Sequence, residues 1–180
     1  TAERTDKNIT ENISVTAKFE KMSYAVKYET DGNGYIAGVE NQEISYGEDA
    51  TKVMAIPNVG YKFVKWSDGK TEDTRQDLSI KENIEVVAEF EFLFAGGSGT
   101  QSNPFIIENY KQLLNMRIYS DQTYRLANDL DLKGINHEPI FDDNEPFSGS
   151  FTGNGKTIDN MTVATDKNYP SLFGFIFGGI

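Results

Sequence analysis

An internal repeat constrains this chain more than any other feature of its sequence. Residues 1–20 and 72–91 align without gaps at an offset of 71 residues and share ten of their twenty residues. A period of about 70 residues is too long for an ordinary solenoid repeat and suits small domains in tandem. The matches are Arg4/Arg75, Asp6/Asp77, Ile9/Ile80, Glu11/Glu82, Asn12/Asn83, Ile13/Ile84, Val15/Val86, Ala17/Ala88, Phe19/Phe90 and Glu20/Glu91.

The repeat divides the chain into four parts. Residues 1–20 are expected to form the C-terminal strands of a preceding repeat, equivalent to those of 72–91, and residues 21–92 form a complete repeat domain. Residues 93–103 are interpreted as a boundary, and residues 104–180 as a separate module. Because the chain starts within a strand-like segment, we expect it to be part of a longer protein.

The complete repeat predicts short β-strands joined by tight turns. Tyr24–Tyr28 alternates between two faces, as a strand does. Asp31–Gly34 is rich in residues that tolerate positive φ, so we expect a turn there and a returning strand at Tyr35–Val39. Gly60–Trp66 alternates again, and Ile84–Phe90 forms the last strand, with its apolar side chains on one face.

Trp66, the only tryptophan, has two interpretations. Strict alternation places it on the strand face opposite Phe63, where its ring could stack on a sugar. An aromatic side chain beside a tight turn, here Ser67–Lys70, more often packs in a core. Core packing is the interpretation we favour.

These residues resemble the divergent InlB B-repeat family over about residues 21–91. The resemblance implies a small β-grasp-like domain of bacterial surface proteins, often in tandem and without catalytic residues. The motifs that carry it are Tyr24-Ala25-Val26-Lys27-Tyr28, Gly60-Tyr61-x-Phe63-x-x-Trp66-Ser67-Asp68-Gly69-x-Thr71, Arg75 and Glu82-Asn83-Ile84-x-Val86-x-Ala88-x-Phe90.

The pattern changes after the Gly-rich stretch Ala95–Thr100. Asn109–Tyr119 has the apolar spacing of a helix, with Asn109 as a suitable N-cap. Short strands separated by Gly and Asn follow up to Phe177, as in the rungs of a parallel β-helix. In the first of them the expected inward side chains are Tyr124, Leu126, Asn128, Leu130 and Leu132.

Residues of about 96–180 resemble the opening of the right-handed β-helix found in GLUG-motif and IgA-protease-type N-terminal regions. The resemblance implies a helix that caps the first coil. We therefore expect a mainly β fold: a small β-grasp-like repeat domain plus the helix-capped N-terminal coils of a right-handed parallel β-helix. The motifs are Asn103-Pro104-Phe105-Ile106-Ile107, Tyr124-x-Leu126-x-Asn128-Asp129-Leu130-Asp131-Leu132, Phe147-Ser148-Gly149-x-Phe151-x-Gly153-Asn154-Gly155 and Leu172-Phe173-Gly174.

The residue inventory argues against catalysis. With no cysteine and a single histidine, His137, the chain lacks the residues for a thiolate metal site, a cysteine nucleophile or a typical zinc hydrolase. Ser150–Thr157 misses one glycine of a phosphate loop. The net charge of −11 disfavours nucleic acid and anionic membrane surfaces as partners. No apolar run approaches the roughly 20 residues that span a bilayer.

Two acidic pairs form a candidate ligand or Ca²⁺ surface. Asp129 and Asp131 share one face if they lie in a strand, an arrangement that serves acid–base chemistry or calcium binding in some polysaccharide-cleaving enzymes. Asp142 and Asp143 fall in a loop whose spacing matches no known calcium site. The alternative, which we favour, is a solvated outer face. No other metal or cofactor is expected.

These observations favour a non-enzymatic module of a secreted or cell-surface bacterial protein, acting as a spacer and an adhesive, ligand-presenting β-structure. Its expected partners are a host or matrix protein or a glycan. The alternative is the N-terminal, non-catalytic part of a secreted enzyme, either an IgA-protease-type metallopeptidase or a polysaccharide-degrading β-helix enzyme. Because Leu172–Phe177 is apolar on both faces, we expect this edge to fold back or to mediate self-association.

Overall fold

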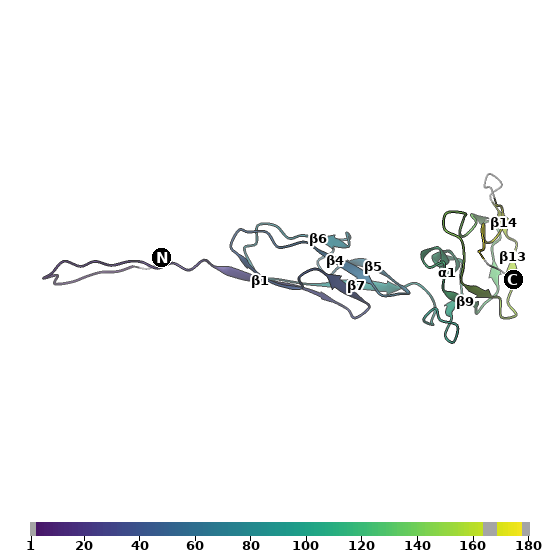
Figure 1. Cartoon of the computed structure of the whole chain (residues 1–180), viewed down its shortest axis with the longest axis horizontal. Coiled ribbons are helices and arrows are strands. Elements are labelled where there is room, and N and C mark those ends of the chain that lie inside the picture. Colours follow the sequence, from purple (N-terminus) through teal and green to yellow (C-terminus); the bar gives the residue numbers. More distant parts are fainter. Residues whose placement is uncertain (1–2, 164–168, 178–180) are drawn as a thin grey trace.

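The computed structural model describes residues 3–163 and 169–177 and is mainly β, with one short α-helix among those residues. Figure 1 shows three parts in a row: an extended N-terminal segment, the repeat domain and a second module that carries α1. No helix in the described part of the chain is long and apolar enough to cross a membrane.

Two sheets build the repeat domain. The first has the strand order β3-β1-β7-β5, in which β1 and β7 are parallel and the outer pairs are antiparallel. The second has the order β2-β4-β6 and is antiparallel. The strands are β1 (Ser23–Thr30), β2 (Gly34–Ala37), β3 (Asn41–Ser45), β4 (Val53–Pro57), β5 (Tyr61–Trp66), β6 (Thr74–Arg75) and β7 (Ile84–Phe92).

Side chains from both sheets share one hydrophobic core. The alternation expected for the last strand is confirmed, since Val86, Ala88 and Phe90 are buried while Glu85 and Glu91 are exposed. Residues from both sheets complete this core, among them Val26, Tyr28, Ile36, Val53, Ala55 and Trp66, together with Ile80 from the loop between β6 and β7.

The structure corrects two details of the predicted strand pattern. β2 follows the turn at Asp31–Gly34 as a strand, but it pairs with β4 in the second sheet and not with β1. In β5 the register with β7 shifts between Phe63 and Lys65. This bulge breaks the strict alternation, so Phe63 and Trp66 pack together, with ring centroids 5.9 Å apart, and do not lie on opposite faces.

The strands expected within residues 1–20 are absent: residues 3–22 contain no strand, and residues 3–20 are exposed. The equivalent segment, β7, gains its order by pairing with β1 on one side and β5 on the other. In this chain both of those strands are already paired with β7. Residues 3–20 pair with neither of them, and apolar side chains such as those of Ile13 and Phe19 are exposed.

The second module is built from parallel strand pairs. β9 lies between β8 and β12, β10 pairs with β13, and β11 pairs with β14, all in parallel. The strands are β8 (Phe105–Ile107), β9 (Thr123–Leu126), β10 (Leu130–Asp131), β11 (Asn136–His137), β12 (Ser150–Thr152), β13 (Ile158–Asp159) and β14 (Thr162–Val163).

The predicted helix is confirmed as α1 (Tyr110–Asn115), continued by the 3₁₀ turn η1 (Met116–Ile118). The Asn109 side chain accepts a hydrogen bond from the Gln112 N–H and so caps α1 as expected. The tighter η1 turn buries Met116 and leaves Ile118 exposed, in contrast to the α-helical spacing.

The inward set of the first long strand is correct except for Asn128. Tyr124, Leu126, Leu130 and Leu132 are buried, but Asn128 is exposed and donates from its side-chain amide to the Glu108 carbonyl. The strand stops after Leu126 and resumes at Leu130, because the chain bends between β9 and β10. Asn128 lies in this bend, and its burial was wrongly predicted from continuous alternation.

Leu172–Phe177 folds back on the second core only in part. Phe173 and Ile176 form single parallel bridges with Ile140 and Phe147. Phe173 packs against Phe147 with ring centroids 5.3 Å apart. The exposed fraction then rises along the segment to 69% at Phe177. The self-association expected of this edge stays a prediction.

The two modules meet through aromatic packing and hydrogen bonds. Leu93 and Phe94, which directly follow β7, belong to the core of the second module, and Phe94 stacks on Phe105 at 4.2 Å. The Tyr119 hydroxyl accepts a hydrogen bond from the Gly60 N–H and donates one to the Tyr61 carbonyl. These contacts join the end of η1 to the start of β5.

Candidate ligand-binding cleft

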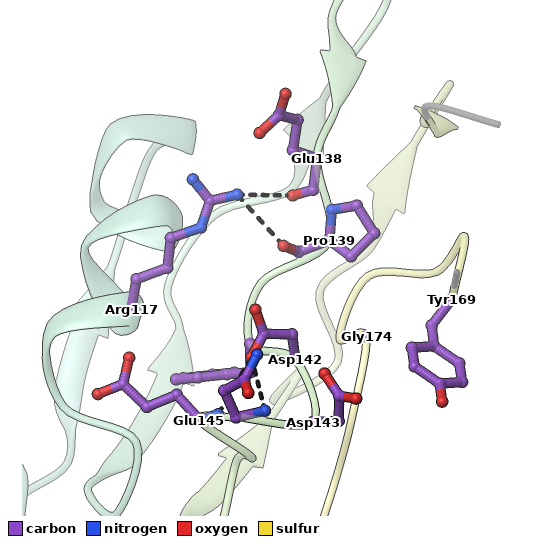
Figure 2. A pocket seen from close by; sticks show the side chains of 10 residues that line it. Arg117, Glu138, Pro139, Asp142, Asp143, Glu145, Tyr169 and Gly174 are labelled. Carbon is purple, nitrogen blue, oxygen red and sulfur yellow. Dashed lines mark hydrogen bonds between the residues drawn. The ribbon is translucent and has the colours of Figure 1, made fainter. Parts of the chain in front are cut away.

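A cleft of about 490 Å³ opens on the second module. Its lining comes from three places: the end of the helix, the loop after β11, and the last described segment. Figure 2 shows the side chains that surround it. They are Arg117, Glu138, Pro139, Phe141, Asp142, Asp143, Asn144, Glu145, Tyr169 and Gly174.

Arg117 fixes the upper wall of the cleft as drawn in Figure 2. Its guanidinium donates to the Glu138 carbonyl at 2.8 Å and to the Pro139 carbonyl at 3.3 Å. Arg117 lies in η1, so these two bonds connect the helix to the loop that follows β11. Among the described residues that line the cleft, Arg117 is the one cation, and four acidic side chains share the lining with it.

The acidic loop 142–145 is held in shape by its own hydrogen bonds. Asp142 accepts, through Oδ1, the N–H groups of Asn144 and Glu145 at 2.9 and 3.1 Å. Phe141 precedes the loop in the left-handed region, with φ of 65°, and its buried ring stacks on Phe147 at 5.0 Å. Core packing thus anchors the loop, and one carboxylate oxygen of Asp142 is used in the hydrogen bonds of the turn.

His137 directly precedes the lining residue Glu138 in the chain and is buried. It is fully buried in β11, which pairs in parallel with β14, so it is a strand residue of the interior. The Tyr110 hydroxyl lies 3.1 Å from Nδ1, and Nε2 lies 3.1 Å from the Leu172 carbonyl. Burial lowers the pKa of His137, so the imidazole is neutral, with Nε2–H donating to Leu172 and Nδ1 accepting from Tyr110.

Asp129 and Asp131 lie outside the cleft lining and serve the strand stack. Asp129 accepts the Thr157 N–H at 2.9 Å. Asp131 accepts the Asn160 amide at 2.8 Å and the Lys133 N–H at 3.0 Å, and these bonds hold the pKa of Asp131 below its usual value. The structure therefore brings Asp142 and Asp143 to the cleft and ties Asp129 and Asp131 to the neighbouring strand. Within residues 3–163 and 169–177, no three His, Asp or Glu side chains are placed to hold a metal ion.

A buried ion-pair network in the repeat domain was missed in the sequence. Arg75 donates to both oxygens of Asp77, at 2.6 and 2.9 Å, and to Asp68 at 2.8 Å. Its guanidinium also lies 5.3 Å from the Trp66 ring centroid. The signal was available, because Arg4/Arg75 and Asp6/Asp77 are two of the ten positions shared by the internal repeat.

Trp66 is part of this network and not of a ligand site. It is fully buried, donates its indole N–H to the Glu72 carbonyl at 2.9 Å, and packs edge-on against Tyr28. The core interpretation of Trp66 is confirmed.

Comparisons with known proteins identify one part of the chain. Residues 24–92 match the family model described as the divergent InlB B-repeat domain. A protein of Evansella cellulosilytica, provisionally named a Gly-rich membrane protein, is 41% identical over an alignment of 93 residues that covers 47% of this chain and 11% of that protein. The chain thus spans about a tenth of the length of this relative. No solved structure matches the chain significantly. Residues 24–92 therefore form a divergent InlB B-repeat domain, a kind of module typical of bacterial surface proteins.

Proposed function

We propose that this chain is a non-enzymatic part of a secreted or cell-surface bacterial protein, in which the repeat domain is a spacer and the second module presents a binding surface. The observation that carries the proposal is the InlB B-repeat domain at residues 24–92, joined directly to a module with an open cleft. The second copy of its C-terminal sequence, at residues 1–20, supports a tandem array. A tandem array extends reach and avidity without new chemistry.

The finer architecture is part of the same proposal. In the repeat domain, the parallel central pair of first and last strands fits a β-grasp-like fold. In the second module, Tyr124 pairs with Phe151, Leu130 with Ile158 and Asn136 with Thr162, each in parallel. These sequence separations are nearly equal, as they are between successive coils of a right-handed β-helix. The module would then be the helix-capped start of such a coil stack.

The cleft is the proposed binding surface, and its chemistry suits a glycan or a polar protein segment. Arg117 offers hydrogen-bond donors, Asp143 and Glu145 offer acceptors, and Tyr169 offers an aromatic side chain. Among the described lining residues, four acidic side chains against one arginine disfavour an anionic ligand such as nucleic acid. Host or matrix proteins and glycans are therefore the proposed partners.

The second candidate function is the N-terminal, non-catalytic part of a secreted enzyme. The parallel strand pairs favour it to the same degree, since polysaccharide-degrading enzymes and secreted metallopeptidases also use such stacks. In this case a catalytic domain elsewhere in the protein would act on a polymer that this part holds.

The test is a binding panel with the full chain, immobilised through its N-terminus. Matrix proteins and glycans are passed over wild type, over a cleft variant (Asp143→Asn with Glu145→Gln), and over a control variant (Glu11→Gln with Glu20→Gln). Both variants remove two exposed carboxylates, and the control pair lies in the N-terminal segment. The same samples are incubated with protein and polysaccharide substrates, with Zn²⁺ and with Ca²⁺.

The proposal expects binding to at least one glycan or matrix protein, loss of that binding in the cleft variant only, and no cleavage. Zinc-dependent proteolysis, or glycan cleavage that Asp129→Ala abolishes, would overturn it. Binding that all three proteins share equally would place the ligand site outside the cleft.

A further inference from the structure

We infer that the divergent InlB B-repeat domain is a mechanical clamp that resists tension between its two ends. The inference gives the proposed spacer role a mechanical function and rests on that role for its purpose. It is carried by the pairing of β1 with β7 and by two side chains that extend this pairing.

The chain enters and leaves the domain through neighbouring parallel strands. β1 is the first strand, β7 is the last, and five residue pairs join them, from Val26–Ile84 to Thr30–Ala88. Because the strands are parallel, the start of β1 and the end of β7 lie at opposite ends of the pair. In Figure 1 the N-terminal segment and the second module accordingly leave the repeat domain at opposite ends.

This topology decides how tension acts on the hydrogen bonds. A pull on residue 22 and residue 93 slides β1 along β7, so every bond between the two strands is loaded at the same time. A hairpin pulled at its open end would instead lose its bonds one after another. The antiparallel pairs β1–β3 and β5–β7 do not lie between the two points of force, so β1–β7 is the element that must break.

Side chains lengthen the clamp at both ends of β1. At the start of the pair, the Ala25 N–H donates to the Asn83 side-chain oxygen at 3.0 Å. At the far end, the Asp31 N–H donates to the Ala88 carbonyl at 3.1 Å, and the Asp31 carboxylate accepts the Phe90 N–H at 2.9 Å. Asn83 directly precedes β7 and Asp31 directly follows β1, so these two side-chain bonds and one backbone bond continue the pairing at both of its ends.

The internal repeat keeps one of these side chains. Asn12 stands at the position of Asn83 in the partial copy, within the shared sequence Glu-Asn-Ile. An exposed position in a terminal segment places no demand for asparagine. In a repeat domain with the same clamp, asparagine at this position would accept a hydrogen bond from the first strand, as Asn83 does here. Tension along a tandem array passes through every domain in series, so each copy needs its own clamp.

The junction with the second module carries the load onward. Leu93 and Phe94 follow β7 without a flexible spacer and lie in the second core. The Asn115 amide donates to the Leu93 carbonyl at 2.7 Å, which holds the chain where it leaves the repeat domain.

The experiment is single-molecule force spectroscopy in two pulling directions. The chain has no cysteine, so one introduced thiol gives a unique attachment point. Both proteins carry the first handle at the N-terminus. In one the second handle is at Ala95→Cys, beyond the end of β7, and in the other it is at Lys81→Cys, before its start. Both positions are exposed. The first geometry loads the β1–β7 pair in shear, and the second peels it apart.

We expect a several-fold higher unfolding force in the Ala95→Cys geometry than in the Lys81→Cys geometry. Adding Asp31→Ala and Asn83→Ala to the Ala95→Cys protein should raise its unfolding rate at fixed force by about tenfold, as loss of two cross-strand hydrogen bonds implies. A matched variant, Lys65→Ala with Glu89→Ala, removes an exposed β5–β7 ion pair and should leave the rate unchanged. Equal unfolding forces in the two directions would overturn the inference. This comparison does not depend on the Asp31→Ala/Asn83→Ala protein, so it stands even if that protein does not fold.

The outcome is independent of ligand binding. A chain that resists force in one direction but binds nothing in the panel would keep the clamp and refute the adhesive role. A chain that binds through its cleft but unfolds at equal force in both directions would support the adhesive role and refute the clamp.

Discussion

Arg75→Met is the substitution that most sharply tests how the repeat domain is stabilised. The Arg75 side chain is 3% exposed and that of Asp77 is 8% exposed, so the pair is removed from water. Methionine keeps most of the apolar volume of the side chain but takes away both bonds to Asp77, the bond to Asp68 and the charge beside Trp66. Asp77 would then keep only Lys70 and Tyr28 as side-chain partners.

The expected cost is set by the charge left behind. Removing one member of a buried ion pair typically destabilises a protein by about 3–5 kcal/mol when the other charge is left uncompensated. Because Asp77 keeps its ion pair with Lys70 and its bond from Tyr28, we expect a cost of about 3 kcal/mol, at the lower end of this range. That is a large share of the roughly 5–15 kcal/mol that hold a domain together. Trp66 is the only tryptophan, so its fluorescence during urea unfolding reports on the repeat domain alone.

The double variant Arg75→Met with Asp77→Leu separates the loss of attraction from the cost of a buried charge that has lost its main partner. Since it leaves no buried charge, it should recover much of the stability that Arg75→Met alone removes. A loss below about 1 kcal/mol for Arg75→Met, or a double variant clearly less stable than the single one, would refute the reasoning.

Three further predictions concern the network and the second module. Burial alone would raise the pKa of Asp77, but hydrogen bonds from Arg75, Lys70 and Tyr28 outweigh this effect and lower the pKa. The stability detected through Trp66 fluorescence should therefore be constant above about pH 4 and fall as the pH drops below it. In Asp77→Asn this fall should be smaller. Burial lowers the pKa of His137, so the second module should lose stability as the pH falls below about 6.5, and calorimetry of His137→Gln should show a flatter dependence. A Cβ at Gly97, where φ is 86°, would lie 1.8 Å from the Pro104 carbonyl oxygen, so Gly97→Ala should destabilise the second module by about 3 kcal/mol or more in calorimetry, against about 1 kcal/mol for the unobstructed Gly155→Ala.

The repeat domain could be predicted from the sequence where one period governs a whole element. Ile84–Phe90 alternates without interruption, and the structure keeps that alternation. The prediction failed where local sequence does not specify pairing: β2 looks like the return of β1 but joins β4, because register across a turn depends on the whole sheet. The bulge after Phe63 also depends on tertiary packing, because it allows Phe63 and Trp66 to pack against each other on one side of the strand.

Residues 1–20 show that sequence identity alone does not make a strand. The segment shares ten residues with 72–91, yet a strand also needs neighbours that accept its backbone hydrogen bonds. The partners of β7 are β1 and β5, which lie before it in the chain. The repeat correctly located a domain and wrongly predicted the structure of its partial copy.

Some residues of the candidate site could be predicted from the sequence, but which of them lie together in the fold could not. Asp142 and Asp143 are adjacent in the chain and both line the cleft. Arg117 and Tyr169 join them only through the fold, so no spacing could have indicated them. Asp129 and Asp131 carried a two-residue pattern, but the bend after Leu126 and the bonds to Thr157 and Asn160 give them a structural role.

The most direct test of the central claim, that this chain displays a binding surface and performs no reaction, is an equilibrium titration. The best ligand of the panel is titrated calorimetrically into wild type, the Asp143→Asn/Glu145→Gln cleft variant and the Glu11→Gln/Glu20→Gln control, and is recovered afterwards for mass analysis. The account predicts saturable binding to wild type and control, and recovered ligand of unchanged mass. In the cleft variant the affinity should be at least about tenfold weaker, which corresponds to a loss of about 1.4 kcal/mol of binding free energy. Ligand recovered in cleaved form, or equal affinity in all three proteins, would contradict it.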